Sequence, residues 1–500
     1  MTPAPGIAYV PGSMRRVMLL AGATLAALAL VLVANTLRFE SRQMAVEPLA
    51  PMALDGDVPL RLAAALRFRT VSHQDPAELD GKQFAGLRRW LEKSFPRVHR
   101  ALSREAVAEH SALFTWTGRE RDLPPVLLLA HLDVVPVDPV TQTAWTHPPF
   151  AGEIADGWIW GRGAMDDKAA VVGLFEAVER LLAGGFVPRR TFLLAFGHDE
   201  EVGGGHGAVA IARLLGERKV SPLFVLDEGL AVTEGIVTDV PAPVALIGIA
   251  EKGYLSVELT VASEGGHSST PPRETAVGIL SAAIHALEQH PARAELVGPA
   301  RRLFEFIGPE TGFATRLALA NLWLFGPLVR SRLAASPASD ALIRTTTAPT
   351  MLEGSVKENV LPARARGVVN FRIRPGETVA SVLEHVRTTV ADARVRIAAL
   401  GPTMSEPSPE SHVDSSGFAA VARTIRQVFP GAVVAPSLVL GATDSRHYAA
   451  LGADVYRFLP FRVRPDDMRR PHGIDERIGV EDYRDAVRFY TQLIRNADPP

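Results

Sequence analysis

Cysteine is absent from this chain of 500 residues. Its absence excludes disulfide bonds and metal sites built on thiolate ligands, and it fits an oxidising compartment without requiring one. A surplus of charge is also missing, because 53 Lys and Arg residues balance 55 Asp and Glu residues, for a formal net charge of -2. Proteins that bind nucleic acid concentrate positive charge, so nucleic acid is not expected as a partner.

What the chain does have is one long uncharged apolar run near its N-terminus. Arg15 and Arg16 precede this run, and the next charged residue is Arg38. The run is long enough for a membrane-spanning helix and longer than the apolar core of a typical signal peptide. Small residues are poorly placed for cleavage after it, and paired arginines stay on the cytoplasmic side of a membrane.

We therefore predict an uncleaved signal anchor at residues 17–37. Residues 1–16 would then lie in the cytoplasm, and the remainder of the chain in the periplasm or lumen. Two alternatives stay open: a cleaved signal peptide, which would release a secreted protein, and an apolar helix packed on the soluble part.

The rest of the chain is too long for a single hydrophobic core, so we expect two domains. After a proline-containing linker at residues 38–57, short apolar runs alternate with helical periodicity, which is typical of an α/β layer with a largely parallel sheet. From about Tyr254, apolar and polar residues alternate instead, as in strands with one exposed face. The first pattern returns after Pro402. This order predicts one domain inserted into another.

Acidic and imidazole side chains come directly after several of the apolar runs. If these runs are buried parallel strands, the side chains gather at one edge of the sheet. Imidazole nitrogen and carboxylate oxygen are zinc ligands, and a catalytic zinc site keeps one position for water. The pattern therefore predicts metal-assisted hydrolysis. The candidate residues are His131, Asp133, Asp166, Glu200, Glu201, Asp227 and His472.

Spacing suggests roles for the first of these residues. Side chains two apart on a strand point the same way, so Asp133 can support His131 as a ligand. The two oxygens of Asp166 can bridge two metal ions. The plainer interpretations are an ordinary loop histidine and aspartate, and an N-cap aspartate for the helix that follows, a position that also suits Asp167.

Glu200 and Glu201 are a sharper signal because adjacent buried carboxylates repel each other unless cations compensate. One of them can bind metal while its neighbour takes the proton from the attacking water. The alternative is a solvated acidic pair, which the apolar run before it and the glycines after it disfavour.

Short motifs of the chain resemble, in order, those of a family of di-zinc exopeptidases and amidohydrolases. The family includes aminoacylase, carboxypeptidase G, succinyl-diaminopimelate desuccinylase and carboxypeptidase S. The motifs span about residues 58–497 and are AHLDVVP, GRGAMDDK, HDEEVGG, LDEG, GGHSS, NVLP and PHGIDER. Two further segments, WTHPPFAGEIADGWIWGRGAMDDK and GATDSRHY, are most similar to the carboxypeptidase S branch, which includes N-fatty-acyl-amino-acid synthase/hydrolase.

The resemblance implies two zinc ions, although cobalt or manganese would accept the same ligands. The implied ligands are His131 and Asp227 for one ion, Glu201 and His472 for the other, and Asp166 as the bridge. Glu200 would be the general base and Asp133 would orient His131. The family also implies a cis peptide between Asp166 and Asp167.

The resemblance further implies a zinc-exopeptidase-like three-layer α/β catalytic domain, formed by residues 58–254 and 399–500. An α+β dimerisation or lid domain would be inserted at residues 255–398, so that the protein forms a homodimer. His267 would come from the second subunit to polarise the scissile carbonyl. Asn359, Arg372 and Arg446 would surround the substrate carboxylate.

The favoured function is hydrolysis of the amide bond in small N-acyl amino acids or dipeptides that carry a free carboxylate. A membrane-tethered binding or scaffold protein on an inactivated hydrolase fold is the main alternative, and an aminopeptidase of related architecture is another. The unusually apolar segment from Leu303 to Val329 has two interpretations. It is either domain core or dimer interface, or an apolar wall or membrane-facing patch that receives a fatty acyl chain.

Overall fold

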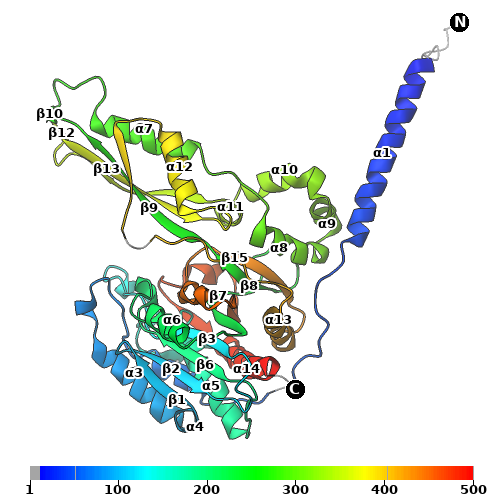
Figure 1. Cartoon of the computed structure of the whole chain (residues 1–500), viewed down its shortest axis with the longest axis vertical. Coiled ribbons are helices and arrows are strands. Elements are labelled where there is room, and N and C mark those ends of the chain that lie inside the picture. The colour runs from blue at the N-terminus through cyan, green and yellow to red at the C-terminus, as the bar shows by residue number, and fades with distance from the viewer. Residues whose placement is uncertain (1–11, 51, 402–403, 499–500) are drawn as a thin grey trace.

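The computed structural model describes residues 12–50, 52–401 and 404–498. Two separate sheets dominate it: a large mixed, mostly parallel sheet and a small antiparallel one above it in Figure 1. The predicted fold class is therefore confirmed. The boundaries at residues 58–254, 255–398 and 399–500 stay a prediction.

The large sheet has eight strands in the order β1-β2-β6-β3-β7-β16-β8-β15. β3 pairs in parallel with both β6 and β7, and every residue of β3 and β6 is buried, as expected for strands covered on both faces. The strands are β1 (Ser103–Val107), β2 (Ser111–Trp116), β3 (Val126–His131), β6 (Phe192–Gly197), β7 (Phe224–Thr233), β8 (Val244–Glu251), β15 (Val433–Val439) and β16 (Asp454–Val463).

Helices cover both faces of this sheet, which gives the predicted three layers. One face packs on a core to which α5 (Lys168–Ala183) and α14 (Val480–Ala497) contribute most of their apolar side chains. α2 (Val58–Ala65), α3 (Gly81–Ser94), α4 (Pro96–Ala101) and α13 (Ser416–Val428) join them. The other face packs on α6 (Ala208–Glu217) and a 3-10 segment, η5 (Asp444–Leu451).

The small sheet, in the order β11-β13-β9-β14, is antiparallel throughout. In β9 alternate residues are buried, and they pack with α7 and α12 into a separate core. The elements are β9 (Gly253–Ala262), β11 (Thr346–Glu353), β13 (Arg364–Ile373), β14 (Val395–Ala399), α7 (Ala276–Gln289) and α12 (Val379–Val390). Two further small sheets pair β10 (Gly266–His267) with β12 (Val360–Leu361), and β17 (Arg477–Gly479) with β5 (Trp158–Trp160) and β4 (Glu153–Ala155).

The apolar segment between α7 and β11 forms four helices: α8 (Gly298–Ile307), α9 (Phe313–Ala320), α10 (Leu322–Leu333) and α11 (Pro337–Ile343). Leu303, Phe306 and Ile307 of α8 belong to the core of the large sheet, not to that of the small one. Part of the segment predicted as inserted domain therefore packs against the catalytic layer.

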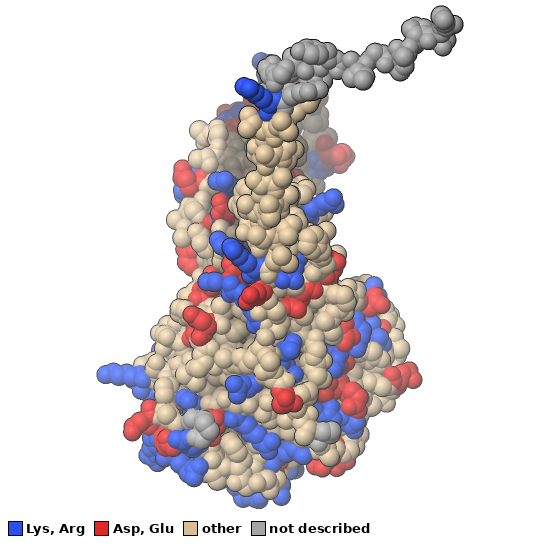
Figure 2. All heavy atoms as spheres, turned by 90° about the vertical axis from the view of Figure 1, so that its right-hand side faces the viewer, with Lys and Arg blue, Asp and Glu red and all other residues tan. Residues whose placement is uncertain are grey.

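Helix α1 (Gly12–Arg38) extends away from the folded body in Figure 1. Its stretch Arg16–Arg38 is long and apolar enough to cross a membrane, by length and composition. No residue of its apolar 18-residue window is buried, whereas Thr36 in the last turn is. Figure 2 shows it as a tan column between basic side chains at its upper end and charged residues gathered at its foot. These properties fit either a signal sequence or an anchor. Most of the predicted cytoplasmic segment 1–16 lies outside the described residues.

Candidate metal centre

The carboxyl ends of β6, β3 and β7 meet at one edge of the large sheet, and polar residues lie there. His131 is the last residue of β3, and Glu200 opens a short 3-10 turn after β6. Asp166 lies in the loop before α5, and His472 lies in a loop of the C-terminal part. The fold thus brings together side chains that are more than 300 residues apart in the sequence.

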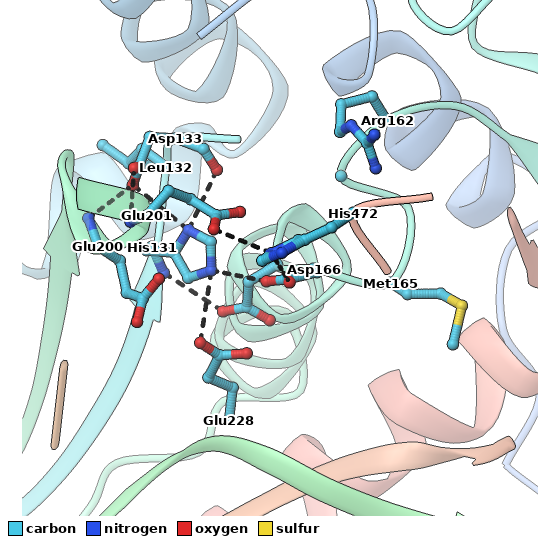
Figure 3. Close-up of polar contacts among 12 residues, drawn as sticks. His131, Leu132, Asp133, Arg162, Met165, Asp166, Glu200, Glu201, Glu228 and His472 are labelled. Atoms are coloured by element: carbon cyan, nitrogen blue, oxygen red, sulfur yellow. Dashed lines mark hydrogen bonds and ion pairs between the residues drawn. The ribbon is translucent and has the colours of Figure 1, made fainter. Parts of the chain in front are cut away.

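Asp166 lies at the centre of this group. Its Oδ1 atom is 2.9 Å from His131 Nε2, and its Oδ2 atom is 3.1 Å from His472 Nε2. The two oxygens of one carboxylate therefore face two different imidazoles (Figure 3). This is the arrangement expected of a carboxylate that bridges two metal ions.

Two groups of candidate ligands share Asp166. Within each group the ligand atoms all lie within 4.8 Å of one another, and the groups are His131–Asp166–Glu228 and Asp166–Glu201–His472. Glu228 Oε1 is 3.5 Å from His131 Nε2, and Glu201 Oε2 is 3.0 Å from His472 Nε2. Each group offers one imidazole and two carboxylates, which is a donor set that zinc accepts.

Asp227, which the resemblance assigned to the first group, points elsewhere. Its Oδ2 atom accepts a hydrogen bond from the backbone N–H of Ser445 at 2.8 Å. It thereby ties β7 to η5, which carries Arg446. Glu228, which sequence reasoning missed, takes the place beside His131.

The alternation of side chains along β7 explains this difference. Neighbouring strand residues point to opposite faces of a sheet. Leu226 packs in the core on the α5 side, whereas Val225 packs in the core on the α6 side. Glu228 shares the face of Leu226, toward α5 and the loop that precedes it. The LDEG motif offers both carboxylates, and only the register of β7 selects one of them.

Asp133 holds three parts of the site together. It is fully buried, and its Oδ1 atom is 3.3 Å from His131 Nδ1. Its carboxylate also accepts hydrogen bonds from the backbone N–H groups of Glu200 at 3.2 Å and Glu201 at 3.1 Å. A carboxylate on the second ring nitrogen fixes the orientation and tautomer of a ligand histidine. Asp133 therefore lies where an orienting residue must lie.

Glu476 is a second residue that sequence reasoning missed. Its buried carboxylate accepts hydrogen bonds from the N–H groups of Gly163, Met165 and Asp166 at 2.8–3.1 Å, and from Arg162 Nη1 at 2.6 Å. It fixes the loop that aims Asp166 to the loop that carries His472. The only signal in the sequence was an unused carboxylate inside the PHGIDER motif.

The backbone beside Asp166 agrees with the resemblance, since the Asp166–Asp167 peptide is cis. Asp167 precedes α5 without capping it through its side chain. Its Oδ2 atom accepts a hydrogen bond from the backbone N–H of His131 at 3.2 Å instead. Asp167 is thus the N-cap residue of α5 by position, as predicted, but its carboxylate is committed to the end of β3.

The electrostatics of the cluster favour bound cations. Burial, reinforced by the charge of Glu228, raises the pKa of Glu200 well above its usual value. Burial and the charge of Asp166 raise the pKa of Glu228 to about 8. Hydrogen bonds with Asp166 and Glu201 raise the pKa of His472 to about 10. Protons on Glu228 and His472 would occupy positions that metal ions take, since ligands bind metal in their deprotonated form.

The residues present fit a pair of metal ions. Within the described part of the chain, Glu201 Oε1 is buried and has no hydrogen-bond partner. Such an orphaned carboxylate oxygen is costly unless a cation or an unseen donor meets it. The carboxylate of Glu200 takes no part in the contacts drawn in Figure 3, so it is not committed to either ligand group.

The four predicted substrate-binding residues fall into two places. His267 of β10 and Asn359, just before β12, lie at the tip of the small domain, away from the strand ends that carry the metal ligands (Figure 1). There, His267 is exposed and the backbone carbonyl of Asn359 accepts a hydrogen bond from Ser268. Within one chain the fold does not bring these two residues to the metal centre.

Arg372 and Arg446 lie closer to the centre and to each other. Arg446 Nη2 donates to the carbonyl of Gly203 at 3.1 Å, immediately after the Glu200–Val202 turn. Arg372 stacks over the ring of Tyr254, with 4.7 Å between guanidinium carbon and ring centroid. Burial and the nearby charge of Arg446 lower the pKa of Arg372. Two like charges that act on each other are suited to binding an anion.

Comparisons with known proteins agree with the geometry. The model of Peptidase family M20/M25/M40 matches residues 127–496. Probable carboxypeptidase S-like 2 of Dictyostelium discoideum is 41% identical over 480 residues, covering 94% of this chain and 92% of that protein. An N-fatty-acyl-amino acid synthase/hydrolase of Danio rerio is 42% identical over 412 residues, covering 82% and 79%. Carboxypeptidase S of Saccharomyces cerevisiae is 32% identical, covering 88% and 84%.

Solved structures show the same fold. An M20 family metallo-carboxypeptidase of Sulfolobus solfataricus superposes with a TM-score of 0.64 at 19% identity, covering 88% of this chain and 99% of that one. Human carnosine dipeptidase 1 gives a TM-score of 0.62 at 16% identity, covering 88% and 95%. The family match, the curated relatives and the ligand groups around Asp166 lead to one conclusion: the chain is an enzyme of the metallopeptidase and amidohydrolase class, and it belongs to peptidase family M20/M25/M40.

Proposed function

We propose that this protein hydrolyses the amide bond of N-acyl amino acids, or of small peptides, that present a free carboxylate. The observation that carries the proposal is the position of Asp166 between two ligand groups, with the Glu200 carboxylate outside both. The relatives named for N-fatty-acyl-amino acids and for carboxypeptidase S supply the substrate class.

We assign the metal ligands as follows from the distances. His131 and Glu228 would hold one ion, Glu201 and His472 the other, and Asp166 both. Zinc fits these donors, and cobalt or manganese would accept them too. When bound, the pair of ions would supply Lewis acidity at the scissile carbonyl and lower the pKa of water.

Glu200 is the general base in this proposal. Asp133 holds the Glu200 backbone by its N–H, so the side chain is aimed by a buried anchor. A carboxylate oxygen of Glu200 takes the proton from the attacking water and then passes it to the nitrogen of the leaving amine.

Arg372 and Arg446 would bind the substrate carboxylate, one from each domain. Guanidinium groups pair well with carboxylates. His267 and Asn359, which are remote from the centre of their own chain, would serve the site of a second copy. This division requires a homodimer through the small domain, with His267 of the partner subunit at the scissile carbonyl.

We further propose that α1 is an uncleaved membrane anchor, with the catalytic part on the extracytoplasmic side. Residues 39–50 are hydrogen-bonded to the large domain. Leu49 N–H donates to Gln427 O at 2.9 Å, and Gln43 Nε2 donates to Val434 O at 2.9 Å. The enzyme would therefore be held close to the membrane surface.

Glu228→Gln and Asp227→Asn test the ligand assignment as a matched pair. Glu228→Gln should weaken binding at one of the two metal positions by at least about 10-fold, because a direct contact is lost. Asp227→Asn should keep both ions, since the amide oxygen can still accept from Ser445. Metal content after dialysis measures both. If Asp227→Asn lost an ion and Glu228→Gln kept two, Asp227 would be the ligand.

The function is tested by measuring how fast the full chain hydrolyses three substrates. They are an N-lauroyl-amino acid, an N-acetyl-amino acid and the methyl ester of the lauroyl-amino acid. Burial of acyl carbon is worth about 0.8 kcal/mol per CH₂, so kcat/KM should favour lauroyl. The methyl ester should react at least about 10-fold more slowly, because it cannot pair with the arginines. Preference for acetyl would reject the fatty acyl substrate. A metal-loaded protein with no turnover of any of them would favour a binding or scaffold role.

A further inference from the structure

The surface of α9 and α10 carries large apolar side chains that face solvent. Trp323 and Phe313 are each 62% exposed, Leu328 is 54% exposed and Leu324 is 41% exposed. Leu303, Phe306 and Ile307 of α8 and Leu319 of α9 are buried, so the segment already has an inward face. The exposed side chains are therefore surplus to what the core needs, and such patches mark interaction surfaces.

The junction of α9 and α10 is attached to the last turns of α1. Asn321, which is fully buried at this junction, donates from Nδ2 to the carbonyl of Leu32 at 3.1 Å, and its Oδ1 accepts from Asn35 Nδ2 at 2.8 Å. The indole N–H of Trp323 also donates to Asn321 Oδ1 at 3.3 Å. Polar groups of the three helices thus satisfy one another where two apolar surfaces meet.

These bonds fix the height of α9 and α10 along α1. Leu32 lies six residues before Arg38 at the end of α1, which is about 9 Å along a helix axis. Helices that lie in a membrane interface are immersed by about 5–10 Å. If α1 crosses a bilayer, the exposed face of α10 therefore lies at the depth of the acyl boundary.

Just beyond the end of α1, contacts made by charged side chains replace the apolar surface. Arg316 Nη2 donates to the carbonyl of Phe39 at 2.6 Å, and Arg42 is 3.7 Å from Glu305. Figure 2 shows charged residues collecting at the foot of the apolar column. The last turn of α10 adds Arg330 and Arg332, whose long side chains can reach the headgroups. An apolar layer thus ends in a charged one, as at a membrane surface.

We propose that α9 and α10 form a second membrane contact, in which Phe313, Trp323, Leu324 and Leu328 enter the bilayer that surrounds α1. The inference rests on the proposed transmembrane anchor. Lipid is the occupant because the acyl chains around α1 are continuous with this face, and tryptophan favours the interface. A protein partner would have to displace lipid from the base of α1. Two attachment points would fix the orientation of the catalytic domain relative to the membrane.

The absence of cysteine allows a direct test. Leu328→Cys, Val187→Cys and Leu25→Cys each place a single thiol for an environment-sensitive fluorophore on the full chain, reconstituted in phosphatidylcholine vesicles. Val187, in the loop between α5 and β6, is 56% exposed and matches Leu328 in exposure, while Leu25 reports on α1. Quenching is measured with a nitroxide carried on the lipid and with iodide in the water.

The label at 328 should show at least about half of the lipid quenching seen at 25, because interfacial helices enter the acyl boundary. The label at 187 should respond only to iodide. Iodide quenching at 328 equal to that at 187 would overturn the inference, and so would protection from both quenchers, which would indicate a second copy on this face. Lipid quenching at 25 without quenching at 328 rejects the second contact alone. No lipid quenching at 25 rejects the anchor and the inference with it.

Discussion

Glu200→Gln is expected to lower kcat by at least about 10², the usual scale for loss of a general base. The amide cannot take the proton from water, while its backbone N–H still donates to Asp133 and its side chain lies outside both ligand groups. Metal content should therefore stay at the wild-type value. Turnover of the best substrate and metal analysis on the same preparation give the two readouts.

Two further variants make this result specific. Glu217→Gln, at the exposed end of α6, should leave turnover and metal content unchanged. Glu201→Gln should lose metal as well as turnover, because its carboxylate lies 3.0 Å from His472 in the second group. A near-normal rate for Glu200→Gln would mean that another group takes the proton.

Asp166→Asn should remove both metal ions. Each oxygen of Asp166 faces a different histidine, and the amide that replaces one oxygen points two hydrogens at the ligands. Loss of a shared ligand should lower metal affinity by at least about 100-fold, which is the upper end of the effect of mutating residues that only support a metal ligand. Turnover should fall with the metal content. The number of metal ions per chain after gel filtration measures the loss of metal.

Asp156→Asn is the matched control for this variant. Asp156 is an exposed residue of the same region, with a φ of 53° that asparagine adopts readily. It should keep wild-type metal content and activity. If Asp166→Asn bound two ions with unchanged affinity, the bridging role proposed for Asp166 would be wrong.

Sequence reasoning could locate those candidate ligands that lie at the end of an apolar run. His131 after β3 and the Glu200–Glu201 pair after β6 illustrate this, since parallel strands buried on both faces leave polar residues only at their ends. The choice between Asp227 and Glu228 was not accessible, because it depends on which face of β7 turns toward α5. Glu476 was missed because most of its partners are backbone N–H groups, which carry no sequence signature.

The apolar segment from Leu303 to Val329 shows the same limit. Its composition predicted burial or an apolar patch, and the structure divides it between the two. Leu303, Phe306 and Ile307 enter the core of the large sheet, whereas Trp323 and Leu328 face outward. Hydrophobicity fixes that a side chain avoids water, but not which neighbour shields it.

The sequence by itself determined the chemical class of this protein, the layered α/β fold with a separate small sheet, and the apolar N-terminal helix. These follow from residue types, strand and helix periodicity, and motif order, all of which act over short distances along the chain. Only the tertiary structure decided that Glu228 lies beside His131 while Asp227 bonds to Ser445, that His267 lies away from the candidate metal centre of its own chain, and that Asn321 joins α10 to α1. Each of these depends on strand register or on packing between distant segments, which local sequence does not encode.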